Sequence, residues 1–211
     1  MNRKNLVVAA AIFAVFAINI AFGLPRLSKY SSVDEPYWTY DRTPDFWRAV
    51  AKQKWKNTDI NDKPGITVAE ISGLGLFSGI NPLKYKSTRQ EAKSIQDSAE
   101  IIRINFFLRL PIYLAGLFML WAFYFFLKKL LNQTIALLSL IFIGLSPIIL
   151  GISLIINPDS LLWGFLPLSI ITFLLHQEKQ QKKYLLISGI FLGLSLLTKY
   201  VANILYVYLF G

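Results

Sequence analysis

Apolar runs long enough to cross a lipid bilayer constrain the fold of this chain more than any other feature. A helix needs about 20 mostly apolar residues to span the hydrocarbon, and residues 6–24, 104–127 and 135–156 each reach that length. Of the 211 residues, 55% are hydrophobic and 15% are aromatic, which exceeds the usual composition of a water-soluble domain. The sequence therefore predicts an all-α polytopic membrane protein.

Two shorter apolar runs extend this pattern. Residues 161–175 follow a turn at Asn157-Pro158, and residues 185–199 end at Thr198-Lys199, so each is expected to return across the bilayer. A sixth run begins at 201–210, where the chain stops in mid-run. We therefore expect residues 1–211 to form a single transmembrane module from the N-terminal part of a longer protein.

Basic residues in the short loops predict the topology. The net charge is +10, and alternating spans would bring one set of basic residues to one side: Arg3, Lys4, Lys128, Lys129, Lys179, Lys182 and Lys183. That side is the cytoplasm by the positive-inside rule, which explains the charge without a nucleic-acid partner. The first run exceeds the 7 to 15 residues of a signal-peptide core, so we expect an uncleaved anchor.

The loop from 25 to 103 then lies on the outer face and has its own helical signals. Thr43 as N-cap, Pro44 at the first helical position and Asp45 in the first turn predict a helix start. The apolar stripe that follows would lie in the membrane surface, with basic residues around it. Residues 66–80 are too short to span and predict a second interfacial or re-entrant segment.

Conspicuous charged residues gather on the same outer face. Asp34 and Glu35 follow the first span, Lys63 lies in the long loop, and Asp159 and Lys199 stand at span ends. Charges near the hydrocarbon are costly and tend to be functional. The structural alternative is that Asp159 caps its helix and Lys199 extends its amine to the interface.

Six motifs in order carry a resemblance to a known family. They are Asp34-Glu35, Lys63-Pro64-Gly65, Arg109-Leu110-Pro111, Ser146-Pro147, Pro-Asp-Ser-Leu-Leu at 158–162 and Gly-Leu-Ser-Leu-Leu-Thr-Lys-Tyr at 193–200. This arrangement resembles the GT-C glycosyltransferases, most of all the protein O-mannosyltransferases and the bacterial aminoarabinose transferases of lipid A (glycosyltransferase family 39 type). The resemblance covers essentially the whole chain. Gly65 departs from it, because the family often has a second proline there.

The resemblance implies a reaction at the outer face of a bacterial plasma membrane. A sugar would move from a polyprenyl-phosphate donor to a hydroxyl of a protein, lipid or glycan, with inversion at the anomeric carbon. It assigns the general base to Asp34 and supporting roles to Glu35 and Asp159. Lys63 would bind the donor phosphate, with Lys199 and Arg109 as alternatives, although Arg109 could instead pair with a carboxylate. The interfacial helices would form a groove for the polyprenyl chain.

Three other interpretations remain beside this one. Outer carboxylates are suitable ligands for a divalent cation, but the resembled branch is metal-independent, so no cofactor is expected. A transporter would use Asp34, Asp159 and Lys199 in a translocation path, which requires charges near the bilayer midplane. A membrane scaffold would bind a partner through the outer loop and would not need Asp34 or Lys63.

Overall fold

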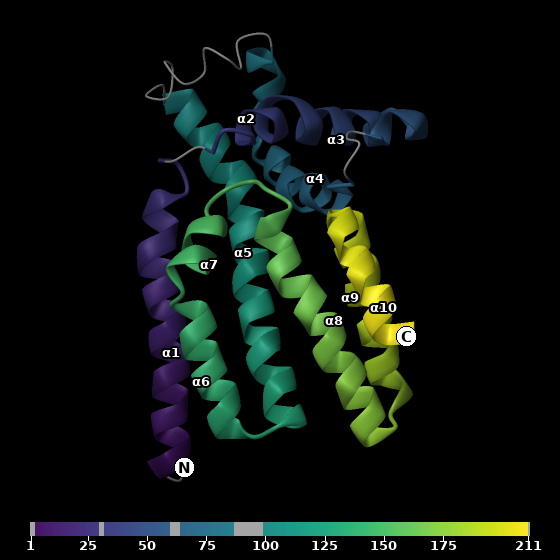
Figure 1. The fold of residues 1–211 in the computed structure, drawn as a ribbon. Coiled ribbons are helices and arrows are strands. Elements are labelled where there is room, and N and C mark those ends of the chain that lie inside the picture. The colour runs from purple at the N-terminus through teal and green to yellow at the C-terminus, as the bar shows by residue number, and fades with distance from the viewer. Residues whose placement is uncertain (1–2, 30–31, 60–63, 87–98, 211) are drawn as a thin grey trace.

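A computed structural model describes residues 3–29, 32–59, 64–86 and 99–210, and this part of the chain is helical with no strand. Its long helices run side by side as a bundle (Figure 1). Among the residues that the structure describes, three helices are long and apolar enough to cross a membrane: Asn5–Arg26, Ala99–Leu130 and Asp159–Lys179. The predicted fold class, an all-α polytopic membrane protein, is confirmed.

The bundle contains seven helices of the described residues. These are α1 (Arg3–Gly23), α5 (Ala99–Leu130), α6 (Gln133–Gly144), α7 (Pro147–Ile152), α8 (Asp159–Lys179), α9 (Lys182–Thr198) and α10 (Ile204–Phe210). The helix α5 packs against α6 and α8, while α9 packs on α8 and α1 packs on α6.

The segment 135–156, expected as one span, is not a continuous helix. The helix α6 ends at Gly144, and α7 begins at Pro147 after an extended Ser146 (φ −63°, ψ 125°). Proline disfavours helical geometry in the residue before it and has no N–H to donate to the preceding turn. The Ser146-Pro147 motif therefore divides this segment.

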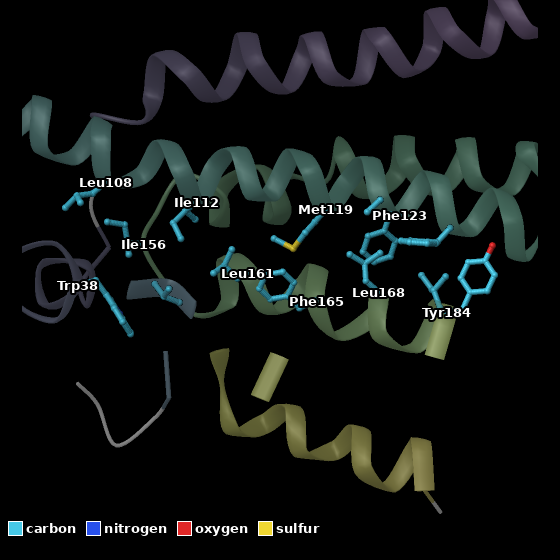
Figure 2. Packing of buried hydrophobic residues seen from close by; sticks show 14 of the residues in the cluster. Trp38, Leu108, Ile112, Met119, Phe123, Ile156, Leu161, Phe165, Leu168 and Tyr184 are labelled. Atoms are coloured by element: carbon cyan, nitrogen blue, oxygen red, sulfur yellow. The ribbon is translucent and has the colours of Figure 1, made fainter. Parts of the chain in front are cut away.

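The main apolar cluster of the described residues joins α5 to α8 (Figure 2). Met119 and Phe123 of α5 face Leu161 and Phe165 of α8, while Trp38 and Tyr184 lie at opposite ends of the row. A side chain at Gly164 would clash with Met119, so the small residue permits close approach of the two helices. The core therefore extends from the bundle to the short helical segment that begins at Trp38.

Short helices lie across one end of the bundle (Figure 1), and we call the described residues 34–59 and 64–85 the end layer. They are α2 (Glu35–Tyr37), the π-helical η2 (Trp38–Arg42), α3 (Thr43–Ala51), η3 (Trp55–Thr58), α4 (Ile66–Gly73), η4 (Leu74–Ser78) and η5 (Pro82–Tyr85). Two further short helices, η1 (Leu24–Arg26) and η7 (Tyr200–Asn203), follow α1 and α9.

The predicted N-cap at Thr43 is wrong. The chain is already helical before Thr43, which has φ −60° and ψ −52°, and the Thr43 N–H donates to the carbonyl of Trp38. Pro44 would clash with the carbonyl four residues earlier in a regular helix, and the wider π turn accommodates it. Within the described residues the buried Thr43 hydroxyl has no hydrogen-bond partner, so it does not cap the helix.

Candidate active site at one end of the bundle

A buried ion pair between Glu35 and Arg109 forms the centre of this end of the molecule. Both side chains are only 1% exposed, and two hydrogen bonds join them, Arg109 Nε to Glu35 Oε1 at 2.6 Å and Arg109 Nη2 to Glu35 Oε2 at 2.9 Å. This is the bidentate geometry that a guanidinium offers to a carboxylate. Arg109 therefore pairs with a carboxylate, which is the alternative to phosphate binding that the sequence allowed.

Backbone groups complete the hydrogen bonding of this pair. The N–H groups of Ile156 and Ser32 donate to Glu35 at 2.9 and 3.1 Å, and Arg109 Nη1 donates to the carbonyl of Leu27 at 2.6 Å. The pair thus joins the end of α1, the start of α2, the helix α5 and the loop before α8. Because Glu35 already accepts four hydrogen bonds, it is suited to hold the backbone in place rather than to accept a proton from a substrate.

Asp34 differs sharply from its neighbour. It is exposed, it precedes α2, and its side chain makes no capping hydrogen bond. Its main chain is held on both sides, since Tyr37 N–H donates to the Asp34 carbonyl at 3.2 Å and Glu35 N–H donates to the Ser32 carbonyl at 3.3 Å. An exposed carboxylate therefore stands on a backbone that the buried pair fixes.

Asp159 and Lys199 pair at the same end of the bundle. Lys199 Nζ lies 2.7 Å from Asp159 Oδ1, and the two side chains are 34% and 44% exposed. Asn157 Oδ1 accepts a hydrogen bond from the Asp159 N–H at 2.9 Å, so Asn157 supplies the local cap at the start of α8. The Asp159 carboxylate remains available to position the Lys199 amine.

Lys63 lies outside the described residues, but the turn that follows it is anchored beside Lys199. The Gly65 N–H donates to the Thr198 carbonyl at 3.0 Å, and the hydroxyls of Thr67 and Thr198 lie 2.6 Å apart. Gly65 has φ +65°, which favours glycine, and a side chain there would clash with the indole of Trp38. A proline could not adopt this φ, so the departure from the family motif fits the local backbone.

Tyr40 lies close to the buried pair. Burial raises the pKa of the Tyr40 phenol to about 12, against the opposing effect of the Arg109 charge. Tyr40 therefore stays protonated at neutral pH. Within the described residues no group of three His, Cys, Asp or Glu side chains gathers to hold a metal ion.

An apolar groove leads from the end layer to the side of α5. Its first part, of about 600 Å³, lies between α3, η3 and α4, and its second, of about 500 Å³, lies between α4, η4 and α5. Ile71 and Leu74 line both parts, so the two parts adjoin each other at these side chains. Trp47 Nε1 donates to the Ala69 carbonyl at 2.9 Å and holds α3 on α4. The groove thus has a fixed floor.

Two features of this region escaped sequence reasoning. The groove extends to Phe107, Leu110 and Leu114 of α5, which share one helix face and could have been found by their spacing. Glu70 is a charged residue at the groove rim, and partial burial among apolar neighbours raises the pKa of its carboxyl. The Thr67–Thr198 contact had no comparable signal, because it joins residues 131 positions apart.

Comparison with known proteins decides the family. The sequence model of the dolichyl-phosphate-mannose-protein mannosyltransferases matches residues 101–211, just over half of the chain. The chain belongs to this family. No curated protein and no solved structure matches it.

Membership of the mannosyltransferase family confirms the resemblance to GT-C glycosyltransferases. It shows that the protein is a membrane glycosyltransferase. The matched region contains Arg109, Asp159 and Lys199, whereas Asp34, Glu35 and Lys63 precede it. Enzymatic function is therefore favoured over the transporter and scaffold alternatives.

Proposed function

We propose that this glycosyltransferase moves a sugar from a polyprenyl-phosphate donor to an acceptor hydroxyl at the outer face of a bacterial plasma membrane, with inversion and with Asp34 as the general base. The observation that carries the proposal is the contrast within the Asp34-Glu35 pair. Glu35 is buried and fully hydrogen-bonded, while the adjacent Asp34 is exposed on the backbone that Glu35 holds in place.

The chemistry requires a proton acceptor. An alcohol is a weak nucleophile at neutral pH, so a carboxylate within hydrogen-bond reach takes its proton as the new glycosidic bond forms. The bond between the anomeric carbon and the phosphate oxygen breaks in the same step, and the electron pair leaves with the phosphate. Attack opposite to the leaving group inverts the anomeric carbon.

The leaving phosphate requires a cation. Lys199 stands at the same end of the bundle as Asp34, and its contact with Asp159 at 2.7 Å holds its amine in position. Lys63, which the resemblance assigns to the donor phosphate, lies outside the described residues and stays a candidate beside Lys199 in this role. Arg109 is excluded from this role, because its guanidinium is buried between Glu35 and Leu27. Charge-assisted hydrogen bonds from lysine stabilise a phosphate as negative charge develops on it.

The polyprenyl chain is assigned to the apolar groove between α3, α4 and α5. Apolar side chains that include Phe46, Trp47, Leu74, Phe107 and Leu110 line it. A lipid in this groove would be shielded along most of its length while its phosphate stays at the end layer. The acceptor would approach from the side of Asp34 that faces solvent.

The test is Asp34→Asn in the full-length enzyme in proteoliposomes. The amide keeps the shape but cannot accept the proton, so we expect a loss in the transfer rate of about 100-fold to 10,000-fold. Donor binding, measured by titration with the polyprenyl-phosphate sugar, should change little. Asp59→Asn is the matched control, since Asp59 is also exposed in the end layer. Transfer by Asp34→Asn at the rate of this control would remove Asp34 as the base.

A further inference from the structure

The helix α3 has a second, polar hollow on the face opposite to the groove. It measures about 300 Å³ and is lined by Asp45, Arg48, Ala49, Lys52, Lys54 and Asn57. Positions 45, 48, 49 and 52 share one face of a helix, whereas Phe46, Trp47 and Val50 point to the other side and line the groove. The two cavities are therefore separate binding surfaces.

The end of α3 is shaped so that the chain returns along this face. The Lys54 N–H donates to the Ala49 carbonyl at 2.9 Å and the Gln53 N–H donates to the Val50 carbonyl at 3.0 Å, which is the Schellman pattern. Gln53 occupies the left-handed position with φ 52°, where glycine is usual. This turn brings Lys54 and Asn57 beside the side chains of Arg48 and Lys52.

The charges in this hollow are unbalanced. The carboxylate of Asp45 is bound at 2.5 Å by Arg48 and at 2.5 Å by Lys86. Lys52 and Lys54 are exposed and form no ion pair with any residue that the structure describes. The C-terminal end of a helix carries only about half a negative elementary charge. The two positive charges of Lys52 and Lys54 are more than this end can balance. Together with the Asn57 amide, they leave hydrogen-bond donors for an anion.

An exposed aromatic side chain beside this hollow favours a place at a membrane surface. Trp55 lies between Lys54 and Lys56, is 65% exposed, and also lines the groove. Tryptophan beside lysine is typical of the boundary between hydrocarbon and lipid headgroups. In Figure 1, α3 lies across the end of the bundle, where the long helices that are able to span a bilayer end.

We propose that the hollow formed by Arg48, Lys52, Lys54 and Asn57 binds the phosphate headgroup of an anionic phospholipid of the surrounding bilayer. Trp55 inserts beside the acyl chains, and the lysines contact the phosphate. Basic residues near a negatively charged membrane surface attract it strongly enough to favour anionic over zwitterionic lipid. Trp55 also lines the donor groove, whereas Arg48, Lys52, Lys54 and Asn57 line only the hollow, so binding of the headgroup does not depend on sugar transfer.

The experiment uses the full-length protein in nanodiscs that contain a photoactivatable phosphatidylglycerol or, for comparison, a photoactivatable phosphatidylcholine. Labelled peptides are located by mass spectrometry. We expect phosphatidylglycerol to label residues 48–57 preferentially and Lys52→Gln/Lys54→Gln to reduce that labelling by about 30-fold. This is about five-fold for each lysine, the factor that ~1 kcal/mol per basic residue near an anionic surface gives.

Lys128→Gln/Lys129→Gln is the matched control, because these lysines lie at the opposite end of the bundle, and it should leave the labelling of residues 48–57 unchanged. Melting temperatures of both double variants verify that they are folded. Equal labelling by the two lipids, or unchanged labelling in Lys52→Gln/Lys54→Gln, would overturn the proposal. Loss of labelling on addition of millimolar inorganic phosphate or of an acidic peptide would assign the hollow to those ligands instead.

Discussion

At the scale of single residues, two adjacent carboxylates have opposite environments. Glu35 lies within the protein and accepts both branches of the Arg109 guanidinium, while Asp34 faces solvent. Adjacent residues of a helical turn point in different directions, so a single turn separates a structural carboxylate from a reactive one. The structural role of Glu35 depends on its burial, and the proposed reactivity of Asp34 depends on its exposure to the acceptor.

Glu35→Gln should therefore act mainly on stability. Removing one charge of a buried pair leaves the other charge uncompensated, which costs about 3–5 kcal/mol. We expect a clearly lower melting temperature for the purified protein in detergent. Glu178→Gln is the control, since Glu178 is 49% exposed and pairs with Lys179 at the surface, where a pair contributes at most about 1 kcal/mol. Equal melting temperatures for the two variants would contradict the structural role of Glu35.

The same pair offers a second test. Glu35→Leu combined with Arg109→Met removes both charges and keeps much of the volume, and such replacements are often neutral or stabilising. The double variant should melt above Glu35→Gln but below the native protein, because backbone groups that the pair binds lose their partners. A double variant as unstable as Glu35→Gln would show that the hydrogen bonds to Leu27, Ser32 and Ile156 carry the stability instead.

At the scale of elements, η4 makes a close backbone contact with α5. A side chain on Gly75 would clash with the main-chain carbonyl of Phe107. The Ser72 hydroxyl donates to the next carbonyl, that of Leu108, at 2.9 Å. These contacts fix the floor of the apolar groove against the bundle.

Gly75→Ala should push η4 away from α5, because main-chain atoms cannot move aside as a flexible side chain can. We expect a loss of about 1–3 kcal/mol in stability, as for overpacked sites, and weaker binding of the polyprenyl donor. Gly151→Ala in α7 is the control, since nothing lies within 4 Å of its added methyl group; it should be neutral or stabilising by about 0.5–1 kcal/mol. Thermal melting and donor titration measure both effects, and identical behaviour of the two variants would disprove the contact.

At the scale of the whole molecule, the two ends of the bundle differ in character. One end carries the end layer with Asp34, and the other carries the N-terminus, the turn after α5 and the turn between α8 and α9 (Figure 1). The basic pairs Lys128-Lys129 and Lys182-Lys183 stand at the second end, and the positive-inside rule predicts that this end faces the cytoplasm.

Single cysteines can test this orientation because the native chain has none. In intact cells a membrane-impermeant maleimide should label Asn57→Cys in the end layer. It should label Lys179→Cys only after the membrane is permeabilised. Labelling of Lys179→Cys in intact cells would invert the topology and place Asp34 on the cytoplasmic side.

The sequence by itself determined the fold class, the positions of the helices α1, α5 and α8, and the family, but not the break within 135–156. Hydropathy and motif order are local properties that need no knowledge of packing. Only the tertiary structure decided that Glu35 binds Arg109, 74 residues away, and that Thr67 meets Thr198. It also decided that Thr43 continues a helix rather than starting one. These outcomes depend on which groups lose their contact with water when helices pack, and burial of that kind is set by the whole fold.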